Sequence, residues 1–185
     1  MTARLAWTYR DYAALPDNGK RHEIHDGELS VTPAPTSLHQ IVLANVFRIV
    51  DAHVRARHLG LVLFAPLDVI LSDRPRETTI LQPDLIYLDH GRLEALRLRG
   101  MEGPPTLAAE ILSPSTAITY RTAKRELYAR YGVPYLWFVD PEAHAIEALV
   151  NHAGQYVVAV RASGAQPIDL PPFTDLGLVP SSLWP

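Results

Sequence analysis

The sequence predicts an α/β fold in which a mixed β-sheet is flanked by α-helices, with one β-hairpin near each end of the chain. Short apolar segments typical of buried strands alternate with longer segments whose apolar residues recur at helical spacing. Two further segments carry the turn chemistry of hairpins. We expect one domain covering residues 1–185, because most of the 16 prolines fall at joints between these elements rather than in a linker.

The first part of the chain is expected to form a short helix, a hairpin and a long helix. Thr8 can cap a helix that runs to residue 15. Residues 22–32 are typical of a hairpin that turns at Asp26-Gly27, since both residue types tolerate the positive φ angles of a tight turn. The longest helix is expected over residues 38–58 with Ser37 as its N-cap, because its apolar residues fall on one face.

The remainder is expected to consist mainly of strands. Apolar segments predict strands over residues 61–66, 67–72, 81–88, 106–113 and 135–140. Amphipathic helices are expected over residues 91–98 and 120–131. Residues 146–151 and 155–161 are typical of a second hairpin, and the proline-rich tail from residue 166 is expected to pack over the outside.

Composition and charge exclude several classes of protein. No stretch approaches the roughly 18 consecutive apolar residues of a membrane span. The first residues lack the apolar core of a signal peptide and the chain has no cysteine, so we expect a cytoplasmic protein without disulfides or thiolate sites. The net charge of −3 argues against a protein that coats nucleic acid, but it allows an enzyme with a local basic groove.

Two acidic residues interrupt apolar segments that are expected to be buried strands. These residues are Asp84 and Glu110. A buried carboxylate costs several kcal/mol unless a partner or a metal ion compensates its charge. On adjacent strands the two would repel each other, and their hard oxygen ligands would suit Mg²⁺ or Mn²⁺. Lys124, one of only two lysines, could reach the same site from the following helix. The simpler alternative is that Asp84 ends a strand or pairs with an arginine, and that Glu110 lies at a strand edge.

Six segments, taken in order, carry a resemblance to a nuclease family. Pro83-Asp84, then Glu110 and a lysine after it, are similar to the pattern of the PD-(D/E)XK nuclease superfamily. Over residues 7–185 the chain resembles the restriction-endonuclease-like family of that superfamily known as Uma-two. The segments are HEIHDGELSVTPAPTSLHQ, PLDVIL, QPDLIYL, AEILSPST, AKRELYARYGVPYLWFVDP and GQYVV. The resemblance implies a restriction-endonuclease-like core to which the N-terminal and C-terminal hairpins are added.

The resemblance also implies a metal site and a catalytic lysine. It assigns Asp84, Glu110 and the main-chain carbonyl of Ile111 as ligands of Mg²⁺ or Mn²⁺, and Lys124 as the lysine. Superfamily members usually carry this lysine two residues after the acid, where the present chain has Leu112. The family often has an aspartate four residues before the displaced lysine, where a tyrosine, residue 120, stands in this chain.

Three other polar residues are candidates for the same site. Glu28 matches a recurrent position of the family and is expected to reach the metal through water. His39 matches another and is expected to contact substrate phosphate or assist proton transfer. The alternatives are a solvated strand residue for Glu28 and a locally bonded helix-start residue for His39. Gln82, two positions before Asp84, could orient its carboxylate.

The function implied by the resemblance is metal-dependent cleavage of phosphodiester bonds in nucleic acid, with DNA expected, by a metal-activated water. One alternative is a catalytically silent nucleic-acid-binding or structural module, which would not bind a divalent metal ion. Another is a metal-dependent phosphatase or phosphodiesterase for a small substrate, which would have a closed pocket.

We expect no membrane partner and leave a homodimer open. Arginines on the two long helices could form a local positive surface, or they could simply be the solvated faces of these helices. They are Arg121, Arg125 and Arg130 on one helix, and Arg48, Arg55 and Arg57 on the other.

Overall fold

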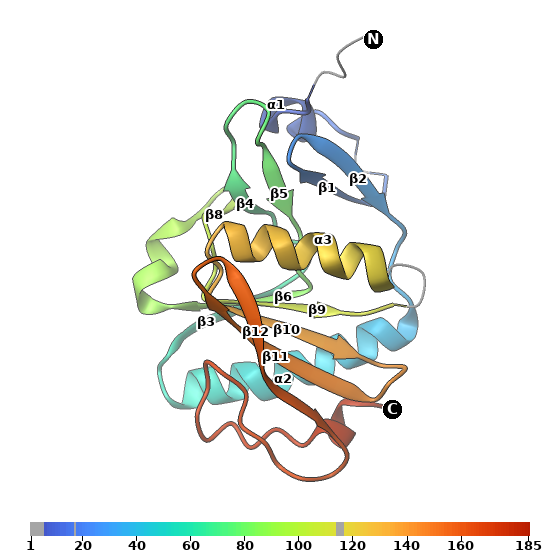
Figure 1. Ribbon diagram of the computed structural model, residues 1–185, viewed down its shortest axis with the longest axis vertical. Coiled ribbons are helices and arrows are strands. Elements are labelled where there is room, and N and C mark those ends of the chain that lie inside the picture. The colour runs from blue at the N-terminus through green and yellow to red at the C-terminus, as the bar shows by residue number, and fades with distance from the viewer. Residues whose placement is uncertain (1–5, 17, 114–116) are drawn as a thin grey trace.

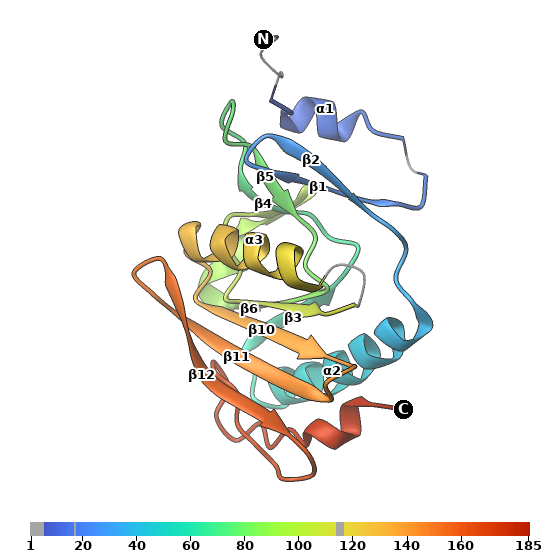
Figure 2. The ribbon, with the colours of Figure 1, turned by 45° about the vertical axis from the view of Figure 1, so that its right-hand side comes forward.

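Two mixed sheets and two long helices are arranged in layers (Figures 1 and 2). The computed structural model describes residues 6–16, 18–113 and 117–185, without the side chains of 117–120. Helix α3 (Ala117–Arg130) lies between the two sheets. Helix α2 (Ser37–Ala56) packs on the opposite face of the second sheet, beside the C-terminal tail. The Pro-Ser-Thr part of the AEILSPST motif and the side chain of residue 120 lie outside the described residues.

The first sheet contains the N-terminal hairpin. Its strand order is β2 (Glu28–Thr32), β1 (Arg21–His25), β5 (Thr79–Leu81), β4 (Val69–Ser72), β8 (Gly100–Glu102) and β7 (Leu96–Arg97). The pair β4–β8 is parallel and the other pairs are antiparallel. The hairpin turns at Asp26 and Gly27, whose φ angles are 50° and 80°. The N-terminal hairpin prediction and its turn are therefore confirmed.

The second sheet contains the C-terminal hairpin and brings the two acidic residues together. Its strand order is β12 (Gln155–Ser163), β11 (Ala145–His152), β10 (Tyr135–Asp140), β9 (Leu107–Ile111), β6 (Leu85–Asp89) and β3 (Gly60–Phe64). Only β9 and β10 pair in parallel among these strands. Leu85 pairs with Ala109 in this antiparallel ladder, so Asp84, which precedes Leu85, faces Glu110, which follows Ala109, at the end of the ladder.

The core lies on both faces of the second sheet. On one face the α2 residues Val42, Val46, Val50 and Val54 are completely buried against β9 and β10. Burying each valine side chain contributes about 1.5–3 kcal/mol. The other face is covered by α3, whose Tyr128 is also completely buried. Helix α3 therefore has an apolar support on the side where the candidate site residues lie.

The predicted α/β class is confirmed, while the strands divide into two sheets at a single proline. The strand expected over residues 81–88 is interrupted at Gln82, Pro83 and Asp84. Proline has no N–H group for a strand ladder, so pairing stops there. The chain leaves the first sheet after β5 and enters the second at β6. Asp84 consequently stands at the crossing between the sheets rather than inside a strand.

Three helix predictions differ in detail from the structure. Helix α1 (Tyr9–Ala13) is capped by Thr8 as expected but ends two residues early. The N-cap of α2 is Thr36 rather than Ser37, because the Thr36 hydroxyl accepts the hydrogen bond from the His39 N–H. The segment expected as a helix over 91–98 is the 3₁₀ helix η1 (His90–Ala95) followed by β7, since a glycine near its start disfavours a longer helix. A second 3₁₀ helix, η2 (Pro180–Leu183), ends the tail.

Within the described part of the chain, no helix combines the length and apolar character that crossing a membrane requires.

The closeness of β3 to β6 can be tested with two glycine substitutions. Gly60 has a φ of 142°, and a Cβ at this position would lie 2.0 Å from the Leu88 carbonyl oxygen. Gly154 has a φ of 86°, and no described atom lies within 4 Å of its Cβ position. Gly154→Ala should lower the free energy of unfolding by about 1–2 kcal/mol through backbone strain alone. Gly60→Ala should lower it clearly more, because β3 must also move away from β6. Urea denaturation measures both losses, and equal losses would contradict this packing.

Candidate active site

Asp84 is held by three elements that are far apart in the sequence. Its side chain is almost completely buried, with 1% exposure. Arg21, from β1, donates a hydrogen bond from Nη2 to Oδ1 at 2.8 Å. The other oxygen, Oδ2, lies 3.1 Å from Nε2 of His39, on the first turn of α2, and accepts the Ile111 main-chain N–H at 2.8 Å. The arrangement joins both sheets and helix α2 at one carboxylate.

A buried lysine joins two further carboxylates. Lys124, on α3, is 1% exposed, and its Nζ lies 2.8 Å and 3.0 Å from the two carboxylate oxygens of Glu110. The same Nζ lies 2.8 Å from Oε1 of Glu23, which comes from β1 in the other sheet. Tyr128, one helical turn after the lysine, donates its hydroxyl proton to Glu110 at 2.6 Å. Lys124 therefore bridges the two sheets between which its helix lies.

The charges of this cluster do not cancel. Asp84, Glu110 and Glu23 are three buried carboxylates, whereas Arg21 and Lys124 are the two permanently charged cations that contact them. One negative charge is left in a region from which water is largely excluded. Such an excess favours the binding of a proton or a cation.

The two facing carboxylates have pKa values that shift in opposite directions. Burial raises the pKa of Glu110, and the nearby charge of Asp84 adds to this effect, although Lys124 opposes it. Burial also disfavours the charged form of Asp84, but the hydrogen bond from His39 and the charge of Arg21 outweigh it and lower its pKa. The environment therefore keeps Asp84 ionised and makes Glu110 the carboxylate that more readily holds a proton.

His39 carries an unused nitrogen next to this cluster. Because Asp84 is ionised, its Oδ2 can only accept a hydrogen bond, so His39 Nε2 must be the donor. When the imidazole is neutral, its single N–H is therefore at Nε2. The other nitrogen, Nδ1, is buried and has no hydrogen-bond partner among the described residues. A buried nitrogen lone pair without a partner can accept a proton or a hydrogen bond from a bound molecule.

These side chains line one cavity of about 290 Å³. Its polar wall consists of Arg21, His39, Asp84, Glu110 and Lys124. Residues 32–36, which connect β2 to α2, form another wall, and residues 111–113 form a third. Arg121 lies at the cavity one turn before the lysine, with its guanidinium 4.7 Å from the ring centroid of Phe138. A phosphate group in this cavity would meet both carboxylates and cations.

The described residues offer two convergent carboxylates for a metal ion, not a complete protein cage. No group of three or more histidine, aspartate or glutamate side chains among them is arranged to hold a metal ion. Asp84 and Glu110 face each other with oxygen ligands of the kind that Mg²⁺ prefers. Each of their oxygens already has a hydrogen-bond partner in the protein. The donor chemistry fits a cation whose remaining positions are filled by water or substrate.

The structure brings together Asp84, Glu110, Lys124, His39 and Ile111, as the sequence predicts. The simpler alternative for Asp84, an arginine partner, also holds for one of its oxygens. Glu110 does not lie at a sheet edge, because β9 is flanked by β10 and β6.

Two expected site residues lie elsewhere. Glu28 is exposed and pairs across the hairpin with His25, at the turn end of β2. This position is about 13 Å along the strand from the end that meets Asp84. The Gln82 amide points away from Asp84, donating to Asp68 at 2.8 Å and to the Tyr12 hydroxyl at 3.1 Å. The hairpin contributes Glu23 instead of Glu28.

Arg21, Glu23 and Tyr128 are cluster members that the sequence reasoning missed. Arg21 and Glu23 lie two positions apart on β1, so strand alternation places them on one face. That alternation is the signal that could have identified them. Tyr128 was expected in the core, where it lies, but its hydroxyl has the additional role of binding Glu110.

Comparison with known proteins identifies similar sequences and structures. Residues 9–181 match the model of a protein family, Uma2, described as "Putative restriction endonuclease". A similar solved structure is that of "a putative nuclease belonging to DUF820" from Anabaena variabilis ATCC 29413. It is 17% identical in sequence, the match covers 96% of this chain and 97% of that chain, and the TM-score is 0.73. At this identity the likeness shows a shared fold. The search of curated proteins gave no match.

The two lysines of the chain provide a matched test of the buried bridge. Lys124→Met leaves Glu23 and Glu110 buried without their cation and should lower the free energy of unfolding by about 3–5 kcal/mol. Lys20→Met removes the same charge from an exposed position and should change it by less than about 0.5 kcal/mol. Urea denaturation of both variants checks the difference.

A less disruptive variant, Glu23→Gln, keeps the prediction testable if Lys124→Met does not fold. Glu23→Gln keeps the shape of the side chain and leaves Lys124 paired with Glu110, so its loss of stability should be smaller than that of Lys124→Met. Equal stability of Lys124→Met and Lys20→Met would contradict the bridge.

Proposed function

The chain belongs to the Uma2 family, as its motifs predict, and on this premise we propose that it is a metal-dependent endonuclease. The reaction would be hydrolysis of a phosphodiester bond in nucleic acid, with DNA as the expected substrate and water as the attacking group. The observation that carries the proposal is the convergence of Asp84, Glu110 and Lys124 on one cavity.

Asp84 and Glu110 would hold Mg²⁺ or Mn²⁺, with the main-chain carbonyl of Ile111 as a third ligand. Mg²⁺ is commonly bound through one or two carboxylates, while water and substrate phosphate complete its coordination. Two carboxylates therefore meet the requirement without a larger protein cage. When bound, the ion would lower the pKa of a water molecule and offset negative charge on the phosphoryl oxygens.

Lys124 and Arg21 would set the charge of the two carboxylates. Lys124 favours the ionised form of Glu110, which burial and the Asp84 charge disfavour. Arg21 does the same for Asp84 through its hydrogen bond to Oδ1. Both cations lie at the cavity wall, where they would also stabilise negative charge that develops on a bound phosphoryl group.

His39 would accept the proton of the attacking water. Its Nε2–H is fixed on Asp84, and its Nδ1 is the nitrogen without a partner among the described residues. A positioned base of this kind contributes about 10²–10⁴-fold to the rate. Asp84 would then have two tasks, namely to bind the ion and to orient the imidazole.

The size of the cavity supports a second candidate function, a phosphodiesterase that acts on a small substrate. A volume of about 290 Å³ lies near the lower limit of ligand cavities, roughly 300–1,000 Å³. A single nucleotide unit would fill such a space, whether it is free or part of a strand. The arginines on the surface next to the cavity favour the strand.

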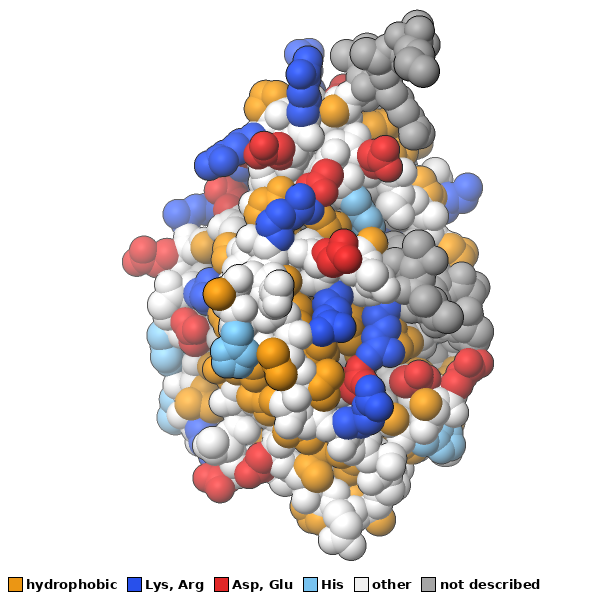
Figure 3. Space-filling view, viewed as in Figure 1, with side chains coloured by type: hydrophobic (Ala, Val, Ile, Leu, Met, Phe, Trp, Pro, Cys, Tyr) orange, Lys and Arg blue, Asp and Glu red, His pale blue; other side chains and the backbone are white. Residues whose placement is uncertain are grey.

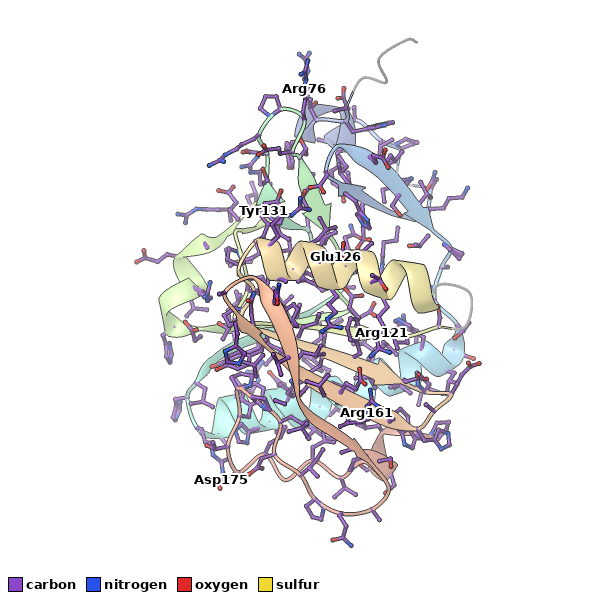
Figure 4. The ribbon with its side chains drawn as sticks, in the orientation of Figure 1. Arg76, Arg121, Glu126, Tyr131, Arg161 and Asp175 are labelled. Carbon is purple, nitrogen blue, oxygen red and sulfur yellow. The ribbon has the colours of Figure 1, made fainter. Side chains whose placement is uncertain are left out.

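The metal-dependent reaction can be tested with isosteric substitutions. We expect cleavage of plasmid or labelled single strands that requires Mg²⁺ or Mn²⁺ and stops with EDTA. Asp84→Asn and Glu110→Gln should each lower the rate by on the order of 100-fold or more, because each removes one charge from the ligand pair. Glu126→Gln changes an exposed carboxylate on α3 and should retain the native rate (Figure 4).

Calorimetry with Mn²⁺ on the same proteins separates the possible results. Binding should weaken in Asp84→Asn and Glu110→Gln and remain in Glu126→Gln. A native chain that neither cleaves nor binds the ion would favour the silent module. Cleavage that survives both site substitutions would place the chemistry elsewhere in the molecule.

The role of His39 predicts a loss that is confined to turnover. In His39→Gln, kcat should fall by about 100-fold, because the proton acceptor is lost. KM and Mn²⁺ affinity should stay near native values, because the glutamine amide can still donate a hydrogen bond to Asp84. His53→Gln is a matched control, because His53 lies on the same helix with the same 7% exposure. A joint loss of kcat and metal affinity in His39→Gln would assign His39 to the metal site instead.

A further inference from the structure

Three arginines form a positive patch beside the cavity. Arg121 and Arg125 come from α3, and Arg161 comes from β12. Figure 3 shows blue side chains gathered around a red one on this face, and Figure 4 labels Arg121 and Arg161 there. Glu147, on β11, is 7% exposed and forms ion pairs with Arg121 through Oε2 and with Arg161 through Oε1. One buried carboxylate therefore holds two guanidinium groups side by side.

The patch keeps one net positive charge, because its three arginines face two carboxylates, Glu147 and Asp140. Glu147 can neutralise one guanidinium, while Arg125 donates to the uncharged main-chain carbonyl of Tyr156 at 2.6 Å. Burial lowers the pKa of Arg121, and the charge of Arg161 lowers it further. A guanidinium has five N–H donors, so the two oxygens of Glu147 leave donors of Arg121 and Arg161 for a ligand. The Arg161 side chain is 70% exposed and accessible to one.

The patch is continuous with the candidate active site. The charged residues that line a hollow of about 240 Å³ are Arg121, Arg161, Glu147 and Asp140. The hollow shares Arg121, Leu112 and Phe138 with the cavity that contains Lys124. Arg121 precedes Lys124 by one helical turn, about 4.5 Å along the axis. A chain of phosphates that enters the cavity can therefore extend directly over the hollow.

We propose that Arg121 and Arg161, held by Glu147, form a second phosphate subsite that binds the backbone of a single nucleic-acid strand next to the bond to be cleaved. This inference rests on the proposed function, in which the cavity that contains Lys124 is the site where the phosphodiester bond is cleaved. Guanidinium groups in a fixed orientation match phosphate oxygens bidentately. A small phosphodiester would occupy the cavity alone, whereas a strand would occupy both. The subsite therefore assigns a polynucleotide rather than a small molecule as the substrate.

The other expected basic surface does not adjoin the cavity. Helix α2 meets the site through its first turn at His39, and Arg55 lies about 24 Å further along its axis at 1.5 Å per residue. Arg55 is a suitable control for Arg161, because the two side chains have the same exposure and each forms an ion pair with one carboxylate. Its side chain is also 70% exposed and also forms an ion pair with one carboxylate, that of Asp51.

The experiment compares strand binding with small-substrate cleavage in Arg161→Ala and Arg55→Ala. Binding of a fluorescein-labelled oligothymidylate is measured by anisotropy over a series of NaCl concentrations, with Ca²⁺ in place of Mg²⁺. Arg161→Ala should weaken binding by about fivefold at low salt and reduce the slope of log K against log salt by about 0.7. Arg55→Ala should leave both values unchanged. Arg161→Lys keeps the charge and should recover most of the slope.

Cleavage of bis(p-nitrophenyl) phosphate tests the first site separately. The native chain and Arg55→Ala should both cleave this diester, which requires only the first site. Cleavage of the oligonucleotide should show a raised KM in Arg161→Ala and a native KM in Arg55→Ala. Native-like strand binding by Arg161→Ala, or no strand binding by the native chain, would overturn the subsite. If strand binding depends on Arg161 but neither substrate is cleaved, the subsite would be supported and the proposed nuclease reaction would be contradicted.

Discussion

The buried ammonium of Lys124 is the interaction on which the rest of the site depends. It forms ion pairs with Glu23 from the first sheet and with Glu110 from the second, and so fixes the position of α3 between them. A buried ion pair adds little stability compared with an apolar core of the same shape, but removing one partner is costly. The chain thus retains a charged centre, although replacing all of its charged side chains together by apolar ones of similar volume would be about equally stable. This is the pattern expected when charge serves chemistry rather than folding.

The crossing of the chain at Pro83 explains how two sheets contribute to one cavity. Because Pro83 lies between the end of β5 and the start of β6, Asp84 stands between the two sheets. Its side chain is reached there by Arg21, by His39 and by the Ile111 N–H. The result is a pair of facing carboxylates with different environments. Asp84 is bound by Arg21 and by His39, whereas Glu110 is bound by Lys124 and lies near two other carboxylates. Opposite pKa shifts of neighbouring acids are typical of sites where one group must stay ionised and the other can exchange a proton.

The arginines beside the cavity give information about the substrate that family membership does not give. The Uma2 match covers residues 9–181 and the similar solved structure shares the fold, but neither specifies which phosphodiester would be cleaved. A fold supports many activities, and the choice among them is made by individual side chains. In the proposed subsite those side chains are the two arginines that Glu147 holds near Lys124, not the arginines on α2.

Sequence alone determined the fold class, both hairpins and the acidic pair with its lysine. It could do so because a charge within an apolar segment, or a turn dipeptide between strands, is visible over a few neighbouring residues. Tertiary structure alone decided that the hairpin supplies Glu23 rather than Glu28, and that Arg21 rather than Gln82 binds Asp84. From the sequence alone, Glu23 and Glu28 are equally plausible as site residues. Strand alternation places both on the same face of the hairpin, but it does not indicate which end of that face is buried. Which end is buried depends on where α3 packs, and that is set by apolar contacts between α3 and strands outside the hairpin.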